Sequence, residues 1–205
     1  MEYVLHTIGH SAHPIGRFCD VLGEHAVNAV ADVRSAPYSR RNPQFNKENI
    51  QTELDRCGIA YVFLGAELGA RPRDPGLYKN GRVAYELVAR TEAFQRGLSR
   101  VRVGLTRFRV ALMCAEGDPV QCHRMILVCR HLKCPELSIQ HILPSGETES
   151  QDDAERRLLR LHSLDHGDFF SEGDELVAQA YLLQEKAIAH SQPQKPNEQL
   201  AASSV

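Results

Sequence analysis

Short apolar segments alternate with amphipathic ones along the first 143 residues, and this alternation leaves the chain few possible folds. Five apolar segments have the length and composition of strands: residues 3–8, 27–33, 59–64, 108–113 and 137–143. Helical patterns separate them, and strands joined through helices pair in parallel because each crossover returns the chain to the same end of the sheet. The sequence therefore predicts an α/β fold, a single Rossmann-like domain with a mostly parallel sheet of about five strands flanked by helices.

Helical periodicity fills the intervals between these strands. The first helix begins at Pro14, and its Ile15, Phe18 and Leu22 recur at helical spacing. The later helices are expected at residues 47–57, 87–101 and 119–132. Two polar loops, one reaching to about residue 46 and one at residues 65–82, are longer than most such connections, and loops of this length are usually functional or disordered.

Beyond residue 144 the pattern changes. Residues 152–162 and 174–189 are typical of amphipathic helices, and residues 191–205 form a polar tail that we expect to be disordered. The predicted organisation is one α/β domain at residues 1–190, with its core at 1–145 and a C-terminal helical extension at 150–190.

Composition excludes several classes of function. The 205 residues carry a net charge of −2, whereas proteins that bind nucleic acid or membrane surfaces over a whole face are normally basic. No run of 18 or more apolar residues indicates a transmembrane helix, and the N-terminal residues lack the pattern of a secretion signal. With six cysteines and no export signal, we expect a cytoplasmic protein with reduced thiols.

Residues 110–124 concentrate reactive side chains. The apolar run at residues 110–113 predicts a buried strand, and the chain then restarts as a helix with Asp118 at the N-cap and Pro119 at its first position. The reactive residues around this junction are Cys114, Glu116, Cys122, His123 and Arg124.

Polar residues also follow the other predicted strands. They are Gly9, His10 and Ser11 after the first strand, Asp32, Arg34, Arg40 and Arg41 after the second, and Glu67, Arg71 and Arg73 after the third, while His141 closes the fifth. Because parallel strands end at one edge, these side chains are expected to meet. In open α/β sheets that edge is where ligands bind, so the sequence predicts a crevice there.

Six short motifs occur in order between residues 7 and 142. They are Thr7-Ile8-Gly9-His10-Ser11, Asp32-Val33-Arg34-Ser35-Ala36-Pro37-Tyr38-Ser39-Arg40, Pro43-Gln44-Phe45-Asn46, Gly58-Ile59-Ala60-Tyr61, Leu112-Met113-Cys114-Ala115-Glu116 and Cys122-His123-Arg124. In these motifs the chain resembles the domain-of-unknown-function family numbered 488. That family name assigns no activity, so the resemblance implies no catalytic roles.

Four residues are candidates for catalysis: His10, Cys114, Glu116 and His123. A thiol can serve as nucleophile or ligand, and an imidazole or carboxylate can move a proton. Structural alternatives remain open for each histidine and thiol. Cys114 would then be a packed core thiol, His10 would bond a loop carbonyl, and His123 would have a capping or structural role.

Seven residues are candidates for substrate binding: Ser11, Asp32, Arg34, Arg40, Arg71, Cys122 and Arg124. Guanidinium groups bind anions through paired N–H donors, and a helix start can lower the pKa of a thiol such as Cys122. The alternatives are structural here too. Ser11 is better placed to cap the following helix. A buried Asp32–Arg34 ion pair is as consistent with the sequence as a ligand contact, and so is pairing of Arg124 with Asp118 or Glu116, while Arg40 and Arg71 would be solvated loop charges.

A metal site is not predicted, and no cofactor can be named. Cys114, Cys122 and His123 are zinc-ligand types, but neighbouring helical residues point about 100° apart, which would keep Cys122 and His123 from sharing an ion. The chain also has no C-x-x-C pair. A Cys114–Cys122 disulfide remains an alternative as a redox event, although a reducing compartment disfavours it.

Absent motifs narrow the functional classes further. The chain has no G-x-G-x-x-G, G-x-x-x-x-G-K-[ST], G-x-S-x-G or H-E-x-x-H motif. The favoured hypothesis is a cytoplasmic enzyme, its reaction class open, that acts on a small anionic substrate, a nucleotide or phosphorylated compound. The alternative is a non-catalytic nucleic-acid or nucleotide binding module in which the Arg-rich loops and Tyr38, Phe45 and Tyr78 contact phosphates and bases.

Overall fold

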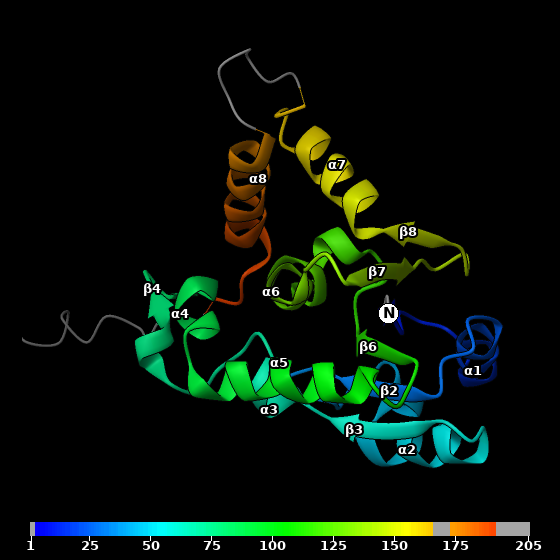
Figure 1. The fold of residues 1–205 in the computed structure, drawn as a ribbon. Coiled ribbons are helices and arrows are strands. Elements are labelled where there is room, and N and C mark those ends of the chain that lie inside the picture. The colour runs from blue at the N-terminus through cyan, green and yellow to red at the C-terminus, as the bar shows by residue number, and fades with distance from the viewer. Residues whose placement is uncertain (1–2, 166–172, 192–205) are drawn as a thin grey trace, which may run out of the picture.

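Six strands form one sheet in the computed structural model, which describes residues 3–165 and 173–191 (Figure 1). Their order in space is β3 (Ala60–Phe63), β2 (Ala29–Asp32), β6 (Val110–Cys114), β1 (Tyr3–Gly9), β7 (Leu137–Ile142) and β8 (Thr148–Ser150). All neighbouring pairs are parallel except β7 and β8, which are antiparallel. The predicted α/β fold with a mostly parallel sheet is confirmed, and β8 adds a sixth strand to the five expected.

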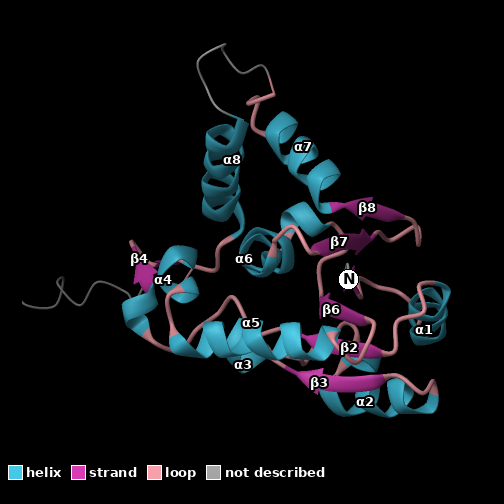
Figure 2. Cartoon of the chain, in the orientation of Figure 1, coloured by secondary structure: helices cyan, strands magenta, loops and turns pink. Residues whose placement is uncertain are grey.

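Helices cover both faces of the sheet (Figure 2). One core cluster contains side chains from α1 (Ile15–Glu24) and α2 (Lys47–Arg56). The cluster on the other face draws on α3 (Gly65–Leu68), α4 (Tyr85–Ala89), α5 (Glu92–Leu105), α6 (Arg130–Leu132), α7 (Gln151–Leu161) and α8 (Gly173–Ile188). Among the helices of the described residues, none has the length and apolar character needed to cross a lipid bilayer.

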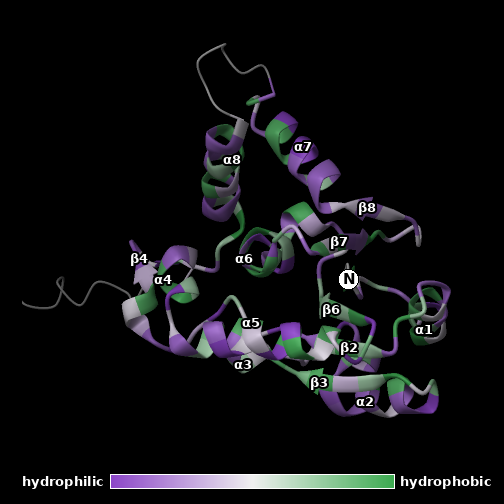
Figure 3. Cartoon of the chain, in the orientation of Figure 1, coloured by the Kyte–Doolittle hydropathy of each residue, from purple (hydrophilic) through white to green (hydrophobic). Residues whose placement is uncertain are grey.

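The central strand β6 is buried on both faces, which explains its uninterrupted apolar sequence (Figure 3). Ala111 and Met113 belong to the cluster beneath α1 and α2, whereas Leu112 and Cys114 belong to the cluster on the opposite face. Successive side chains of a strand alternate between faces, so the position of Cys114 at the strand end directs its sulfur away from α1 and α2.

The two C-terminal helices pack on the same core as the sheet. Ala154 and Leu158 of α7 and Ala180 and Tyr181 of α8 are buried in the cluster that contains Cys114. The predicted polar tail at 191–205 lies outside the described residues except for Ser191.

The loop predicted at residues 65–82 contains regular structure. It includes α3, a 3₁₀ turn at Pro75–Leu77 and a hairpin of β4 (Tyr78–Lys79) and β5 (Arg82–Val83). Asn80 and Gly81 connect the two strands with φ angles of 52° and 74°. An Asn-Gly pair with two positive φ angles is a preferred hairpin turn, because its twist matches that of the flanking strands. This Asn-Gly pair was the overlooked sequence signal.

The single helix predicted at residues 87–101 is two helices, α4 and α5. Thr91 separates them with extended backbone angles, and its hydroxyl accepts a hydrogen bond from the Phe94 N–H at 3.2 Å. A threonine in this position is a standard N-cap, so the break is encoded locally.

The helix predicted at residues 119–132 is wrong at its start. Pro119–Gln121 form a 3₁₀ turn, which the Asp118 carboxylate caps by accepting a backbone hydrogen bond at 3.1 Å. The Cys122 N–H closes this turn on its first residue at 3.1 Å, and Cys122 itself is extended, with φ −134° and ψ 139°. Regular structure resumes as a π-helix at Arg124–Cys129 that continues into α6. Short π-helical segments are frequent at functional sites.

Candidate functional site

The carboxyl ends of β1, β2 and β6 bring predicted site residues together. Gly9 is in register with Cys114, and the next N–H, that of His10, donates to the Cys114 carbonyl at 2.9 Å. Two residues beyond β2, the Nη1 atom of Arg34 lies 3.2 Å from His10 Nε2. The structure therefore gathers His10, Arg34 and Cys114 at one edge of the sheet, as the strand pattern predicts.

Four side chains at this edge form a compact group, which we call the thiol cluster: Cys114, Glu116, Cys122 and His123. The Oε2 atom of Glu116 lies 3.1 Å from Cys114 Sγ and 3.3 Å from Cys122 Sγ. The Nδ1 atom of His123 lies 3.6 Å and 3.9 Å from the same two sulfur atoms. The two cysteines and the histidine are buried, and their three ligand atoms lie within 4.8 Å of one another. They are the residues of the described chain able to hold a metal ion.

The extended backbone at Cys122 corrects the argument that kept this residue and His123 apart. That argument placed both residues on one helix, whereas Cys122 precedes the helix and His123 is its N-cap. A change from extended to helical backbone between adjacent residues lets both side chains face the same point.

The pKa values of the two buried thiols are shifted in opposite directions. The hydrogen bond with Cys122, together with burial, raises the pKa of the Cys114 thiol. Burial alone would also raise the pKa of Cys122, but the hydrogen bond from Cys114 and the positive charge of Arg124 hold it well below the usual value. The neighbouring His123 has a pKa that is raised, against the effect of its burial, by the hydrogen bond to Cys122.

Gly9 allows the loop after β6 to cross the end of β1. A Cβ atom at this position would lie 1.8 Å from the backbone oxygen of Glu116 and 2.8 Å from the Cα of Gly117. Both are backbone atoms, which a side-chain rotation cannot move away. Glycine is therefore required here for Glu116 to reach the thiols.

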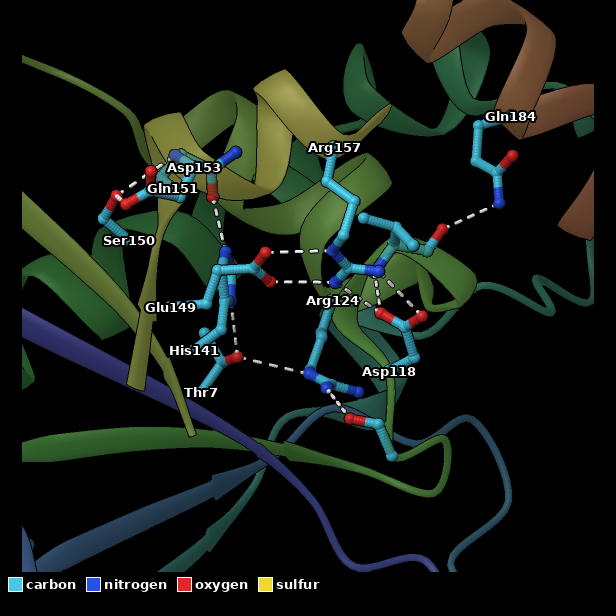
Figure 4. A network of polar contacts seen from close by, with 12 residues as sticks. Thr7, Asp118, Arg124, His141, Glu149, Ser150, Gln151, Asp153, Arg157 and Gln184 are labelled. Atoms are coloured by element: carbon cyan, nitrogen blue, oxygen red, sulfur yellow. Dashed lines mark hydrogen bonds and ion pairs between the residues drawn. The ribbon is translucent and has the colours of Figure 1, made fainter. Parts of the chain in front are cut away.

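Arg124 fixes the loop after β6 through hydrogen bonds to its backbone. Its fully buried guanidinium donates to the carbonyl oxygens of Glu116 and Gly117, the latter at 2.8 Å, and its Nε donates to Thr7 at 3.2 Å (Figure 4). The Thr7 hydroxyl in turn contacts His141 at 2.8 Å. These bonds give Arg124 a positioning role, and it pairs with the backbone rather than with the carboxylates that the sequence suggested.

The C-terminal helices fasten the turn that precedes Cys122 (Figure 4). Arg157 of α7 donates to both oxygens of Asp118, at 2.8 and 2.9 Å, and also to Glu149. Gln184 of α8 donates to the Val120 carbonyl at 2.8 Å. The helical extension thus supports the site, a contribution that the sequence did not reveal.

A second group, the paired cluster, consists of His10, Asp32, Arg34 and Tyr61. Asp32 is fully buried and accepts from Arg34 Nε at 2.9 Å, Arg34 Nη2 at 2.7 Å and the Tyr61 hydroxyl at 2.8 Å. His10 Nδ1 donates to the Ser11 carbonyl at 2.9 Å, so its Nε2 accepts from Arg34. Burial lowers the pKa of His10 to about 4, with a smaller contribution from Arg34, and its ring stacks on Phe45.

A cavity of about 180 Å³ opens beside the thiol cluster. Its lining residues are Ala70, Arg71, Tyr85, Glu116, Gln121, His123, Ile188 and His190. Sequence reasoning missed Tyr85 and His190. His190 reaches the cavity because its carbonyl accepts a hydrogen bond from the Val83 N–H at 3.0 Å, a contact between segments more than 100 residues apart. A larger depression of about 560 Å³ beside β7 contains none of the candidate residues.

The remaining predicted binding residues are dispersed. The predicted cap by Ser11 is wrong, because α1 begins after Pro14 and its N-cap makes no side-chain hydrogen bond. Ser11 instead has a positive φ of 48°, and its N–H extends the strand pairing to the Ala115 carbonyl at 2.9 Å. Arg40 and Arg71 are both exposed, and of the two only Arg71 lines the cavity. Substrate contacts by these residues stay predictions.

The chain belongs to the family described as "Domain of unknown function DUF488", whose model matches residues 14–130, more than half of its length. This confirms the family resemblance, and five of the six motifs lie within the matched segment, whereas the motif at residues 7–11 precedes it. The matched segment contains the whole thiol cluster and ends before α7 and α8. Neither the curated proteins nor the solved structures gave a match.

Proposed function

We propose that this protein is a cytoplasmic enzyme that acts on a small anionic substrate, a nucleotide or a phosphorylated metabolite, at the cavity beside the thiol cluster. The observation that carries the proposal is the meeting of a cation, a carboxylate and an imidazole on that cavity: Arg71, Glu116 and His123. A guanidinium offers an anion paired hydrogen-bond donors, and a carboxylate beside an imidazole can transfer protons.

The size of the cavity limits what it encloses. At about 180 Å³ it is smaller than the roughly 300–1,000 Å³ of pockets that enclose whole drug-sized ligands. It fits a phosphate group and the atoms next to it, so the rest of a nucleotide would extend outside.

Each cavity residue has a role that follows from its position. Arg71 binds the anionic group, and its N–H bond to the Ser35 hydroxyl at 2.9 Å anchors the loop that carries it. Glu116 moves the proton, since its carboxylate faces both the cavity and the thiols. His10 and Arg34 keep the sheet edge in shape rather than touch the substrate, because their polar atoms are already paired with one another and with Asp32.

The binding half of the proposal is tested with a panel of nucleotides and sugar phosphates, using calorimetry on the wild-type chain. Arg71→Ala should weaken binding at least about tenfold, the value of one charge-assisted hydrogen bond. Arg73→Ala is the matched control, because Arg73 is also exposed but lies outside the cavity lining. Equal losses in both variants, or no binding by any compound, would overturn the assignment.

The catalytic half is tested with Glu116→Gln on whichever compound binds. Turnover should fall at least about a hundredfold while binding persists, as expected for the loss of a general acid–base group. Binding of single-stranded DNA, measured in parallel, tests the alternative of a non-catalytic nucleic-acid binding module. Tight DNA binding that weakens steeply with salt and is unaffected by Glu116→Gln would identify a nucleic-acid binding module instead.

A further inference from the structure

Three side chains of the thiol cluster have the spacing of a metal centre. The His123 Nδ1 atom lies 3.6 Å from Cys114 Sγ and 3.9 Å from Cys122 Sγ. A tetrahedral zinc ion, with Zn–S bonds of about 2.3 Å and Zn–N bonds of about 2.0 Å, separates sulfur and nitrogen ligands by about 3.6 Å. Both sulfur–nitrogen distances are therefore already close to those that a shared zinc ion requires, and all three donor atoms lie within 4.8 Å of one another.

The hydrogen bond on the far side of the His123 ring sets the proton position that a metal ligand needs. His123 Nε2 lies 3.0 Å from the Val33 carbonyl oxygen. A carbonyl only accepts, so Nε2 carries the proton and the Nδ1 lone pair points at the two sulfur atoms. Histidine ligands of metals almost always donate their second N–H to a carbonyl or carboxylate in this way.

Polar groups surround the sulfur of Cys122. Cys122 is buried, its sulfur accepts the Arg124 N–H at 3.5 Å, and a carboxylate oxygen of Glu116 lies 3.3 Å away. Cys129, equally buried seven residues further on, has a pKa raised by that burial, as expected of a packed thiol. Two cysteine sulfurs and an imidazole nitrogen are a ligand set suited to zinc rather than to calcium or magnesium, which bind oxygen, and binding of the ion would release the thiol protons.

We propose that Cys114, Cys122 and His123 bind one Zn²⁺ ion whose fourth coordination position opens toward the cavity. Glu116 and His123 both line that cavity, and Glu116 contacts both sulfur atoms. Three protein ligands with one open position define a catalytic rather than a structural zinc site. A water molecule in the fourth position would lose a proton near neutral pH, with Glu116 placed to accept it. The metal site goes beyond the proposed function, since it requires no particular substrate.

The test is the metal content of the full chain, purified under reducing conditions without chelator and measured by elemental mass spectrometry. The wild type should contain about one zinc ion, and a chelated sample refilled with Co²⁺ should show the absorption of a tetrahedral cobalt–thiolate centre. Cys122→Ser and His123→Gln should each weaken zinc binding at least about tenfold. Cys129→Ala and Cys134→Ser, a buried and an exposed control outside the cluster, should keep it.

His123→Cys is a further control, because it changes the same position as His123→Gln but replaces one metal ligand with another. It retains three ligands, so it should keep the metal while its cobalt spectrum shifts. The proposal is overturned if the reduced wild type takes up neither zinc nor cobalt, if the ligand variants bind as well as the controls, or if a Cys114–Cys122 disulfide forms in place of the metal. Glu116→Gln separates the two proposals, because it should keep the ion and lose turnover.

Discussion

The paired cluster and the thiol cluster lie at the same edge of the sheet but on opposite faces, and they differ in how their polar groups are satisfied. In the paired cluster Asp32 accepts three side-chain hydrogen bonds, and both ring nitrogens of His10 have partners. In the thiol cluster two sulfur atoms and His123 Nδ1 have mainly one another and Glu116 as neighbours.

This difference in hydrogen bonding distinguishes a cluster that stabilises the fold from one that is proposed to bind a ligand. Buried charges that are fully paired hold a structure in place, whereas the donors of the thiol cluster lie close together beside a cavity, as the proposed metal site requires. Both clusters contain the residue types that sequence reasoning selects for catalysis. Their hydrogen-bond partners, not their identity, distinguish the two.

The largest effect should come from breaking the paired cluster. Arg34→Met leaves the fully buried Asp32 carboxylate without its cation, which should lower the free energy of unfolding by about 3–5 kcal/mol. Urea denaturation measures this. Adding Asp32→Asn should recover part of the loss, and a loss below about 1 kcal/mol in the single variant would contradict the structural role of the pair.

A smaller effect is expected at Gly9, which lets the loop of the thiol cluster pass over β1. Gly9→Ala places a Cβ against the Glu116 backbone and should cost about 1–3 kcal/mol of unfolding free energy. It should also weaken zinc binding, because the displaced loop carries the residues after Cys114. Gly16→Ala is the control, since a Cβ there meets nothing within 4 Å. Equal stability of the two variants would show that the close approach is not maintained.

The pH dependence of the unfolding free energy tests the paired cluster through His10. His10 has a pKa of about 4 in the folded chain, mainly because of burial, against about 6.5 when unfolded. Its contribution to stability is therefore present above about pH 6.5 and is lost as the pH falls toward 4, because the unfolded chain takes up the proton first.

The loss attributable to His10 should approach about 1.4 kcal/mol per pH unit within that window. Urea unfolding between pH 7 and 4.5 measures the slope for the wild type and for His10→Asn. The variant should show a slope shallower by that amount, whatever its stability at pH 7. Identical slopes would mean that His10 is not held neutral by its surroundings.

The smallest effect on stability is expected at Arg71, which is exposed. Arg71→Ala should change the free energy of unfolding by less than about 0.5 kcal/mol, as surface substitutions usually do. The contrast with Arg34→Met would show that two arginines at one sheet edge serve different purposes. A loss above about 1 kcal/mol for Arg71→Ala would remove that distinction.

Sequence patterns recovered most of the sheet but not the local geometry of the site. The apolar runs located β1, β2, β3, β6 and β7, and parallel pairing then placed His10, Arg34 and Cys114 at one edge. Periodicity failed at Cys122, where a proline-initiated 3₁₀ turn replaced the expected helix. The argument against a shared metal ion depended on that helix. His190 was missed because only long-range pairing with Val83 carries it to the cavity.

The sequence by itself determined the α/β fold, the family and the edge at which reactive residues collect, because strand burial and alternation are local properties of apolar side chains. Only the tertiary structure decided which of those residues pair with one another and which converge around an open cavity. Hydrogen-bond partners and the distances between sulfur, nitrogen and carboxylate atoms arise from contacts between segments far apart in the chain, and no local pattern encodes them.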